Sequence, residues 1–93
     1  NFISIVTSSK SKQNASKELE KIKIDLKKNF SQLLIYGPAP SLLEKKNRLY
    51  RFRLLLKLLK NYKFQTKVKK YLKSVTSTNQ TRVFIDVDPI NFL

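Results

Sequence analysis

Residues 48–57 read Arg-Leu-Tyr-Arg-Phe-Arg-Leu-Leu-Leu-Lys, and this stretch decides the fold of the chain. Apolar and basic side chains alternate along it with a period of two, which is typical of a β-strand with one face in a core and the other in water. The predicted core face carries Tyr50, Phe52, Leu54 and Leu56. The other face carries Leu49, Arg51, Arg53, Leu55 and Lys57. A helix would instead scatter the arginines among the apolar residues.

The chain on both sides of this strand supplies neighbours for it. Residues 2–7, which are rich in β-branched side chains, predict a first strand, and residues 33–36 and 82–87 predict two more. Gly37-Pro38-Ala39-Pro40 is expected to end the strand at 33–36, because proline cannot donate to a ladder. Residues 41–47 are then expected to form a loop.

Two segments have apolar residues at helical spacing. The first helix is expected to start at Ser11 or Asn14, the candidate caps, and to reach Phe30. The second is expected to begin between Leu59 and Tyr62 and to end at a polar turn over residues 74–80. The predicted order is β-α-β-β-α-β, an α+β fold of the split βαβ or ferredoxin-like kind, with an antiparallel sheet and two helices on one face. The predicted core consists of Leu19, Ile22, Phe52, Leu54, Leu56, Phe64, Val68, Leu72, Val83 and Ile85.

Length and charge limit the class of protein. The 93 residues predict a single domain over residues 1–93. The formal net charge is +14, with 20 Lys and Arg against 6 Asp and Glu, which favours a polyanionic partner such as nucleic acid. A compositional bias towards lysine is the plainer explanation, but it does not account for so few acids.

Catalytic chemistry finds little support in the sequence. Without His or Cys there is no thiolate metal site and no common general base, and a single Gly cannot build a phosphate loop. Asp86 and Asp88 could share a cation, although a solvated turn at the end of the strand is the favoured interpretation. We therefore expect no enzyme activity, no metal and no cofactor in this chain. No apolar run approaches the roughly 20 residues of a membrane span, so an intracellular location without membrane contact is expected.

Two surfaces are candidates for binding nucleic acid. The first is the basic face of the organising strand, with Arg51, Arg53 and Lys57, joined by Phe84 on the last strand. An exposed ring beside basic groups is typical of surfaces on which single-stranded bases stack. Alternatively, Phe84 is covered by a partner domain or by the chain end. The second surface is a basic stripe predicted along the second helix, formed by Lys60, Lys63, Lys67 and Lys70.

Three blocks of sequence resemble one known family. They are Ile35-Tyr36-Gly37-Pro38-Ala39-Pro40, then Tyr50-Arg51-Phe52-Arg53-Leu54-Leu55-Leu56-Lys57, and finally Ile85-Asp86-Val87-Asp88-Pro89. In this order and with these gaps they resemble the C-terminal domain of the primosomal replication helicase PriA, also called primosomal protein N′. The resemblance is specific from about residue 33 onwards, whereas the first strand and helix fit only by pattern.

The resemblance implies a role that composition alone could not show. The parent would be an ATP-dependent DNA helicase that restarts stalled replication forks in the bacterial cytoplasm, at the nucleoid. Its motor, with ATP and magnesium, and its zinc-binding domain would lie upstream. The C-terminal domain of this family resembles a small-subunit ribosomal protein, contributes to binding single-stranded and forked DNA, and packs on the helicase core.

A second partner implied by the resemblance is the acidic tail of single-strand DNA-binding protein. In the family, polar residues early in the second helix face this tail, and Gln65 matches one of them. The family's arginine one turn earlier falls near Asn61 here, so Lys60 or Lys63 would have to replace it. Two alternatives remain open on the residues themselves. These are an RNA-binding or ribosomal-type protein of similar fold, and a docking module for acidic protein tails.

Overall fold

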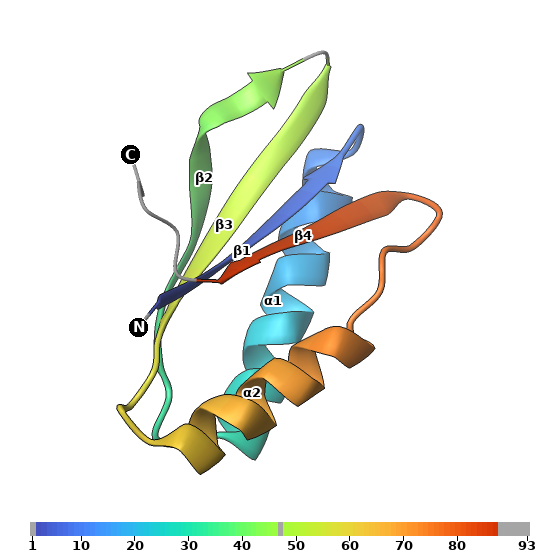
Figure 1. Cartoon of the computed structure of the whole chain (residues 1–93). Helices are drawn as coiled ribbons and strands as arrows, with labels where there is room; N and C mark the ends of the chain where they lie inside the picture. The colour runs from blue at the N-terminus through green and yellow to red at the C-terminus, as the bar shows by residue number, and fades with distance from the viewer. Residues whose placement is uncertain (1, 47, 88–93) are drawn as a thin grey trace.

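The computed structural model contains the six elements in the predicted order (Figure 1). It describes residues 2–46 and 48–87, and for residues 42–46 it describes the backbone alone. The elements are β1 (Phe2–Ser9), α1 (Lys12–Asn29), β2 (Leu34–Lys46), β3 (Leu49–Lys57), α2 (Tyr62–Ser74) and β4 (Thr81–Val87).

The strands form one antiparallel sheet in the order β2-β3-β1-β4. The two central strands, β1 and β3, each pair on both sides, and β2 and β4 form the edges. Figure 1 shows α1 and α2 on the same side of this sheet, so one sheet face is covered and the other is open. The α+β class and the split βαβ topology are therefore confirmed.

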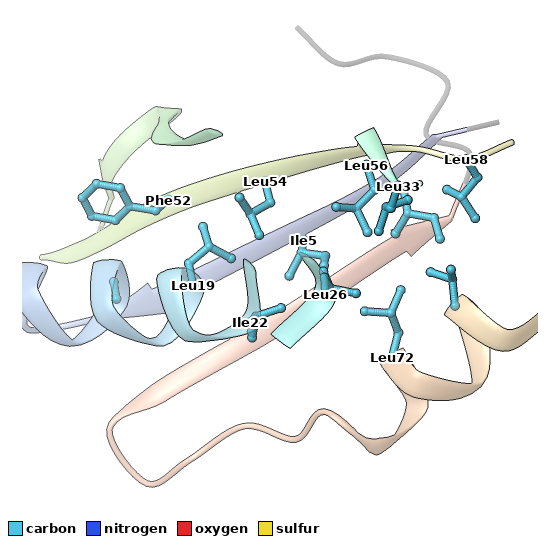
Figure 2. Close-up of a cluster of buried hydrophobic side chains, with 13 residues drawn as sticks. Ile5, Leu19, Ile22, Leu26, Leu33, Phe52, Leu54, Leu56, Leu58 and Leu72 are labelled. Carbon is cyan, nitrogen blue, oxygen red and sulfur yellow. The ribbon is translucent and has the colours of Figure 1, made fainter. Parts of the chain in front are cut away.

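The alternation in β3 is confirmed by the pairing register. Leu54 lies opposite Ile5 of β1, and Ile5 in turn lies opposite Ile85 of β4. In Figure 2 Leu54 points from the sheet towards α1, where Leu19 lies. Both of these leucines have no exposed surface, so the even-numbered residues of β3 belong to the core as predicted.

Most of the predicted core is buried. The seven buried members are Leu19, Ile22, Phe52, Leu54, Leu56, Val68 and Leu72. Val83, Ile85 and Phe64 pack against this cluster but keep part of their surface exposed. Val83 and Ile85 lie on the edge strand β4, where the sheet has no further neighbour, and Phe64 lies in the first turn of α2. Their partial exposure follows from these marginal positions.

Side-chain caps set the start of both helices. Ser11 is the N-cap of α1, and its Oγ accepts a hydrogen bond from the Asn14 N–H at 3.2 Å. The open choice between Ser11 and Asn14 is thus decided for Ser11. Asn61 caps α2 in the same way by accepting from the Phe64 N–H at 3.0 Å, so α2 begins at Tyr62, within the predicted window.

An aromatic cluster joins the end of α1 to α2. The ring of Phe30 lies edge-on to the rings of Phe64 and Tyr71, with centroid separations of 6.1 Å and 5.9 Å. Edge-to-face pairs of this kind add about 0.5–1.5 kcal/mol each beyond their buried area. The cluster therefore fixes α2 against α1 as well as against the sheet.

The predicted end of the second strand was wrong. Pro38 and Pro40 do not end β2, which runs on to Lys46 and takes in most of the predicted loop. The strand tolerates them because β2 is an edge strand and its register shifts between Tyr36 and Ala39 and again between Pro40 and Lys45. Gly37, with φ +102, provides the backbone conformation that the first irregularity requires.

Candidate nucleic-acid interface

The uncovered side of the sheet, here called the open face, carries the basic residues of β3. In the register, Arg51, Arg53 and Lys57 alternate with the buried residues of that strand and so lie on this face. The neighbouring central strand β1 contributes Ser4, Val6 and Ser8, whose side chains are short. The short side chains of β1 are therefore flanked on this face by longer side chains from β3 and β4.

Phe84 and Arg53 lie in one row across the open face. Val6 pairs with Arg53 on one side and with Phe84 on the other. Neighbouring strands lie about 4.8 Å apart, so the two backbones are separated by about 10 Å. The Phe84 side chain is 49% exposed within the described structure. An exposed ring and a half-buried arginine thus lie on the same surface.

A second exposed ring lies near the opposite edge. Tyr36 of β2 is 53% exposed and pairs with Leu55 of β3. Beside it a shallow hollow of about 450 Å³ opens over the first irregularity of β2. Its lining consists of Tyr36, Gly37, Ala39, Pro40, Ser41, Arg53 and Leu55. The open face therefore has aromatic rings towards both edges and Arg53 between them.

The charge on the open face is almost entirely positive. Arg51, Arg53, Lys57 and Arg82 all lie on it. Among its described side chains, Asp86 is the single acidic residue, and it is exposed beside Ser4. Three of the six acids of the chain, Glu18, Glu20 and Asp25, lie instead on α1. The acids that could neutralise the open face are thus largely elsewhere.

The basic stripe on α2 is shorter than predicted. Lys63, Lys67 and Lys70 are exposed and lie on the side of α2 away from the buried Val68. Lys60 is also exposed, but it precedes the cap Asn61 and so does not belong to the helix. No acid occurs in α2. Since α2 covers the other side of the sheet, the structure does not bring this stripe and the open face together (Figure 1).

Gln65 and Lys63, the predicted partner residues, point in different directions. They are two residues apart in one helix, which places them about 200° apart around its axis. The Gln65 Nε2 donates a hydrogen bond to the Leu59 carbonyl at 2.9 Å, whereas Lys63 is exposed. An arrangement in which both contact one narrow ligand would therefore need that ligand to wrap around the start of α2.

Metal and membrane sites find no geometric support in the described residues. Across residues 2–41 and 48–87, no group of three or more acidic, His or Cys side chains could hold a metal ion. Asp86 is exposed, and Asp88, its predicted neighbour, lies outside the described residues. Within the same part of the chain, neither helix is long and apolar enough to cross a membrane.

A comparison with protein families accounts for nearly the whole chain. The model of the primosomal protein N C-terminal domain matches residues 1–90. The chain belongs to this family. The match includes β1 and α1, which in the sequence analysis fitted the family only by their pattern of strand and helix. No match was found among curated proteins.

Family membership supports a primosomal role, in the restart of replication. It associates the chain with the DNA replication machinery. The match is to a C-terminal domain, so the chain corresponds to that domain of primosomal protein N and not to a motor.

Several residues of the site were missed by the sequence interpretation. Tyr36 was assigned to a strand, but its exposure was not predicted, because residues 33–36 are all apolar or aromatic and show no alternation. Tyr62, at the start of α2, is 83% exposed. The first strand was predicted over residues 2–7, whereas β1 continues to Ser9 and so includes Ser8. Only the register reveals that Ser8 lies between Arg51 and Arg82.

Proposed function

We propose that this domain binds DNA through its phosphates, without sequence preference, and helps to place a helicase motor on branched forks. The observation that carries the proposal is the open face, which combines Arg51, Arg53, Lys57 and Arg82 with exposed rings and has a single described acid. Phosphate contacts of this kind give affinity and position without reading bases. The family's primosomal role supplies the context of a replication fork.

The rings favour a single strand on the open face. A base stacked on an aromatic side chain contributes about 1–3 kcal/mol and does so for any base. Phe84 on the edge strand β4 offers such a ring, with β1 between it and the arginines of β3, and Tyr36 on the other edge strand β2 offers another. The exposed lysines of α2 are suited to a second segment of DNA, because they lie on the other side of the molecule.

The start of α2 is the proposed contact for the acidic tail of single-strand DNA-binding protein. Its support is the exposed Lys63 and the absence of acids in the first turn, together with the match of Gln65 to the family pattern. The remaining partners follow from the family. We propose that the chain works with a helicase core of the same polypeptide in the cytoplasm. In this proposal ATP, magnesium and zinc are bound by other domains, and this domain binds no cofactor.

A salt titration tests the DNA-binding proposal. The 93-residue chain is titrated onto fluorescent single-stranded, duplex and forked DNA at several salt concentrations. If about five phosphates are neutralised, log K falls with log salt with a slope of about −3.5 on single strands and about −4.5 on duplex. A flat salt response, or a strong preference for one base sequence, would contradict phosphate contact.

Two controls separate the alternatives. Duplex RNA added as competitor should displace forked DNA poorly. An RNA-binding protein of this fold would instead prefer the RNA. An acidic peptide that binds the chain while DNA does not would indicate a docking module for protein tails.

A further inference from the structure

We propose that a pocket at one end of the sheet, where β1 leads into α1, binds a single phosphate group of a nucleic-acid strand. The inference deepens the proposed function and rests on it for the source of the phosphate. The pocket shares Ser8 and Arg82 with the open face, and its other lining residues were not used in the proposals above.

The pocket is a concave space of about 540 Å³ lined mainly by residues with polar side chains. It lies between the end of β1, the first turn of α1 and the loop that leads into β4. The lining residues are Ser8, Ser9, Lys10, Ser11, Asn14, Leu49, Thr78, Asn79, Gln80, Thr81 and Arg82. Ten of these eleven residues have hydroxyl, amide or basic side chains, Leu49 is the exception, and none is acidic.

Ser8 supplies an unused hydrogen-bonding group in this wall. The residue is only 4% exposed, yet its hydroxyl has no hydrogen-bond partner among the residues that the structure describes. The Ser8 oxygen is not among the fully enclosed side-chain atoms that lack a partner, so it is open to the pocket and available to a ligand there. The adjacent Ser9 shows the contrast, because its hydroxyl donates to the Gln80 carbonyl at 2.7 Å and accepts from the Ser11 N–H at 3.1 Å.

Two arginines flank Ser8. It pairs with Arg51 of β3 on one side and with Arg82 of β4 on the other, so both belong to its row on the open face. Neither arginine forms an ion pair with any described residue. The Arg51 Nε is closed to solvent and has no hydrogen-bond partner there either. The backbones of the two arginines are about 10 Å apart. Arg82 lines the pocket and Arg51 does not, so an anion in the pocket would offset the charge of Arg82 and of Lys10.

The start of α1 adds to the positive potential. Its first turn contains no acid, so the partial positive charge of the helix end is not offset there. Lys10 is exposed at the pocket. The bonds of Ser9 hold the loop before β4 against the start of α1, which shapes the pocket before any ligand arrives.

These features match a phosphate more closely than a carboxylate. A phosphate offers three or more acceptor oxygens, and a terminal one carries about −1.5 to −2 charges at pH 7. Guanidinium groups bind such oxygens in pairs, and a serine hydroxyl can donate to another. The position beside the proposed single-strand path suggests two sources, a terminal phosphate monoester or an internal diester.

Inorganic phosphate tests the pocket without DNA. In ¹H–¹⁵N spectra of the 93-residue chain, phosphate at constant ionic strength should shift the amides of Ser8, Lys10 and Arg82 with a saturating curve, and chloride should not. Ser8→Ala removes no charge and should still lower phosphate affinity about tenfold, because it removes a hydrogen bond to a charged group. Lys28→Gln on α1, away from the pocket, should leave that affinity unchanged.

Shifts spread evenly over exposed lysines would overturn the proposal, as would an affinity that Ser8→Ala does not change. The Ser8→Ala protein must keep the wild-type spectrum elsewhere. If it does not fold, Arg82→Gln, at an exposed position, replaces it and should lower phosphate affinity more than Lys28→Gln does.

Oligonucleotides then separate the sources and the two proposals. Tighter binding of a 5′-phosphorylated strand than of the same strand with a 5′-hydroxyl supports a terminal phosphate. Equal affinities that both fall in Ser8→Ala support an internal phosphate. Equal affinities that Ser8→Ala leaves unchanged overturn the pocket while DNA binding stands. Saturable phosphate shifts in a chain that binds no oligonucleotide would support the pocket proposal and contradict the proposed function.

Discussion

The Tyr71 hydroxyl on α2 donates a hydrogen bond to Asp25 Oδ2 on α1 at 3.3 Å. Burial of the phenol raises the pKa of Tyr71 above its ordinary value, and the negative charge and hydrogen bond of Asp25 raise it further. The un-ionised phenol is therefore favoured in the folded protein. This bond connects the two helices across 46 residues of sequence, next to the Phe30 ring cluster.

We expect the Tyr71 contact to make stability fall at alkaline pH. Because the folded-state pKa is above the unfolded value near 10, the contribution of Tyr71 is full below about pH 10 and is lost as pH rises through the raised pKa. Tyr71→Phe lacks this loss. Denaturant unfolding at pH 8 to 11 should therefore show wild type losing stability relative to Tyr71→Phe. Tyr62→Phe, at a position 83% exposed, should run parallel to wild type. A constant difference between wild type and Tyr71→Phe would contradict the shift.

Truncation of Phe52 tests the register of β3. Phe52 is 7% exposed on the core face, so Phe52→Ala should lower the free energy of unfolding by roughly 3–5 kcal/mol. Phe84→Ala is the matched control at a ring that is 49% exposed, and it should cost about 1 kcal/mol or less. Urea denaturation of both variants gives the comparison. A larger loss for Phe84→Ala than for Phe52→Ala would refute the assignment of the faces.

Much of the fold could be predicted from the sequence because its elements have clear local patterns. The alternation around Phe52 predicted β3 and its faces, Ser11 was one of two candidate caps for α1, and the start of α2 was predicted within residues 59–62. The length of β2 could not be predicted in this way. Whether Pro38 and Pro40 end a strand depends on whether that strand lies at an edge, and strand order is set by pairing between distant segments.

Charge reversal on α2 tests the second DNA surface. Lys67→Glu with Lys70→Glu should weaken binding to all DNA sequences alike and reduce the magnitude of the salt slope by about 2, because two phosphate contacts are lost. Lys17→Glu with Lys21→Glu on α1 changes the net charge equally and serves as the control. Fluorescence anisotropy across a salt series measures both. Equal weakening by the two pairs would show that only net charge matters.

Removal of the Phe84 ring tests base stacking on the open face. Phe84→Ala should weaken single-stranded DNA by about 1–3 kcal/mol and duplex DNA by less, because paired bases cannot stack on the ring. Phe84→Tyr keeps the ring and should restore single-strand affinity. Parallel losses on both kinds of DNA would argue that Phe84 does not stack on bases.

Substitution of Gly37 tests the first irregularity of β2. Its φ of +102 is strained for any L side chain, and a Cβ there would lie 2.7 Å from the Arg53 carbonyl oxygen. Gly37→Ala should therefore cost at least about 1–3 kcal/mol in unfolding free energy. Ala39→Gly, two residues along the same strand and exposed, should cost no more than about 1 kcal/mol. Thermal or chemical unfolding that finds the two variants equal would contradict this account.

The candidate site was less predictable than the fold for the same physical reason. Arg51 and Arg53 were assigned to a wet face from alternation alone, which the structure confirms. The rows that join Arg51 to Ser8 and Arg53 to Phe84 depend on register between strands far apart in sequence. Lys60 was assigned to the helix by its spacing, but the cap at Asn61 excludes it.

The two prolines of β2 also affect how this protein behaves at high concentration. An open sheet edge can pair with the edge of another molecule, and such pairing is a common start of aggregation. Natural edge strands discourage it with prolines and bulges, and β2 has Pro38, Pro40 and two register shifts. These features protect the β2 edge from pairing with a second copy, while the proposed ligand face of the sheet stays uncovered.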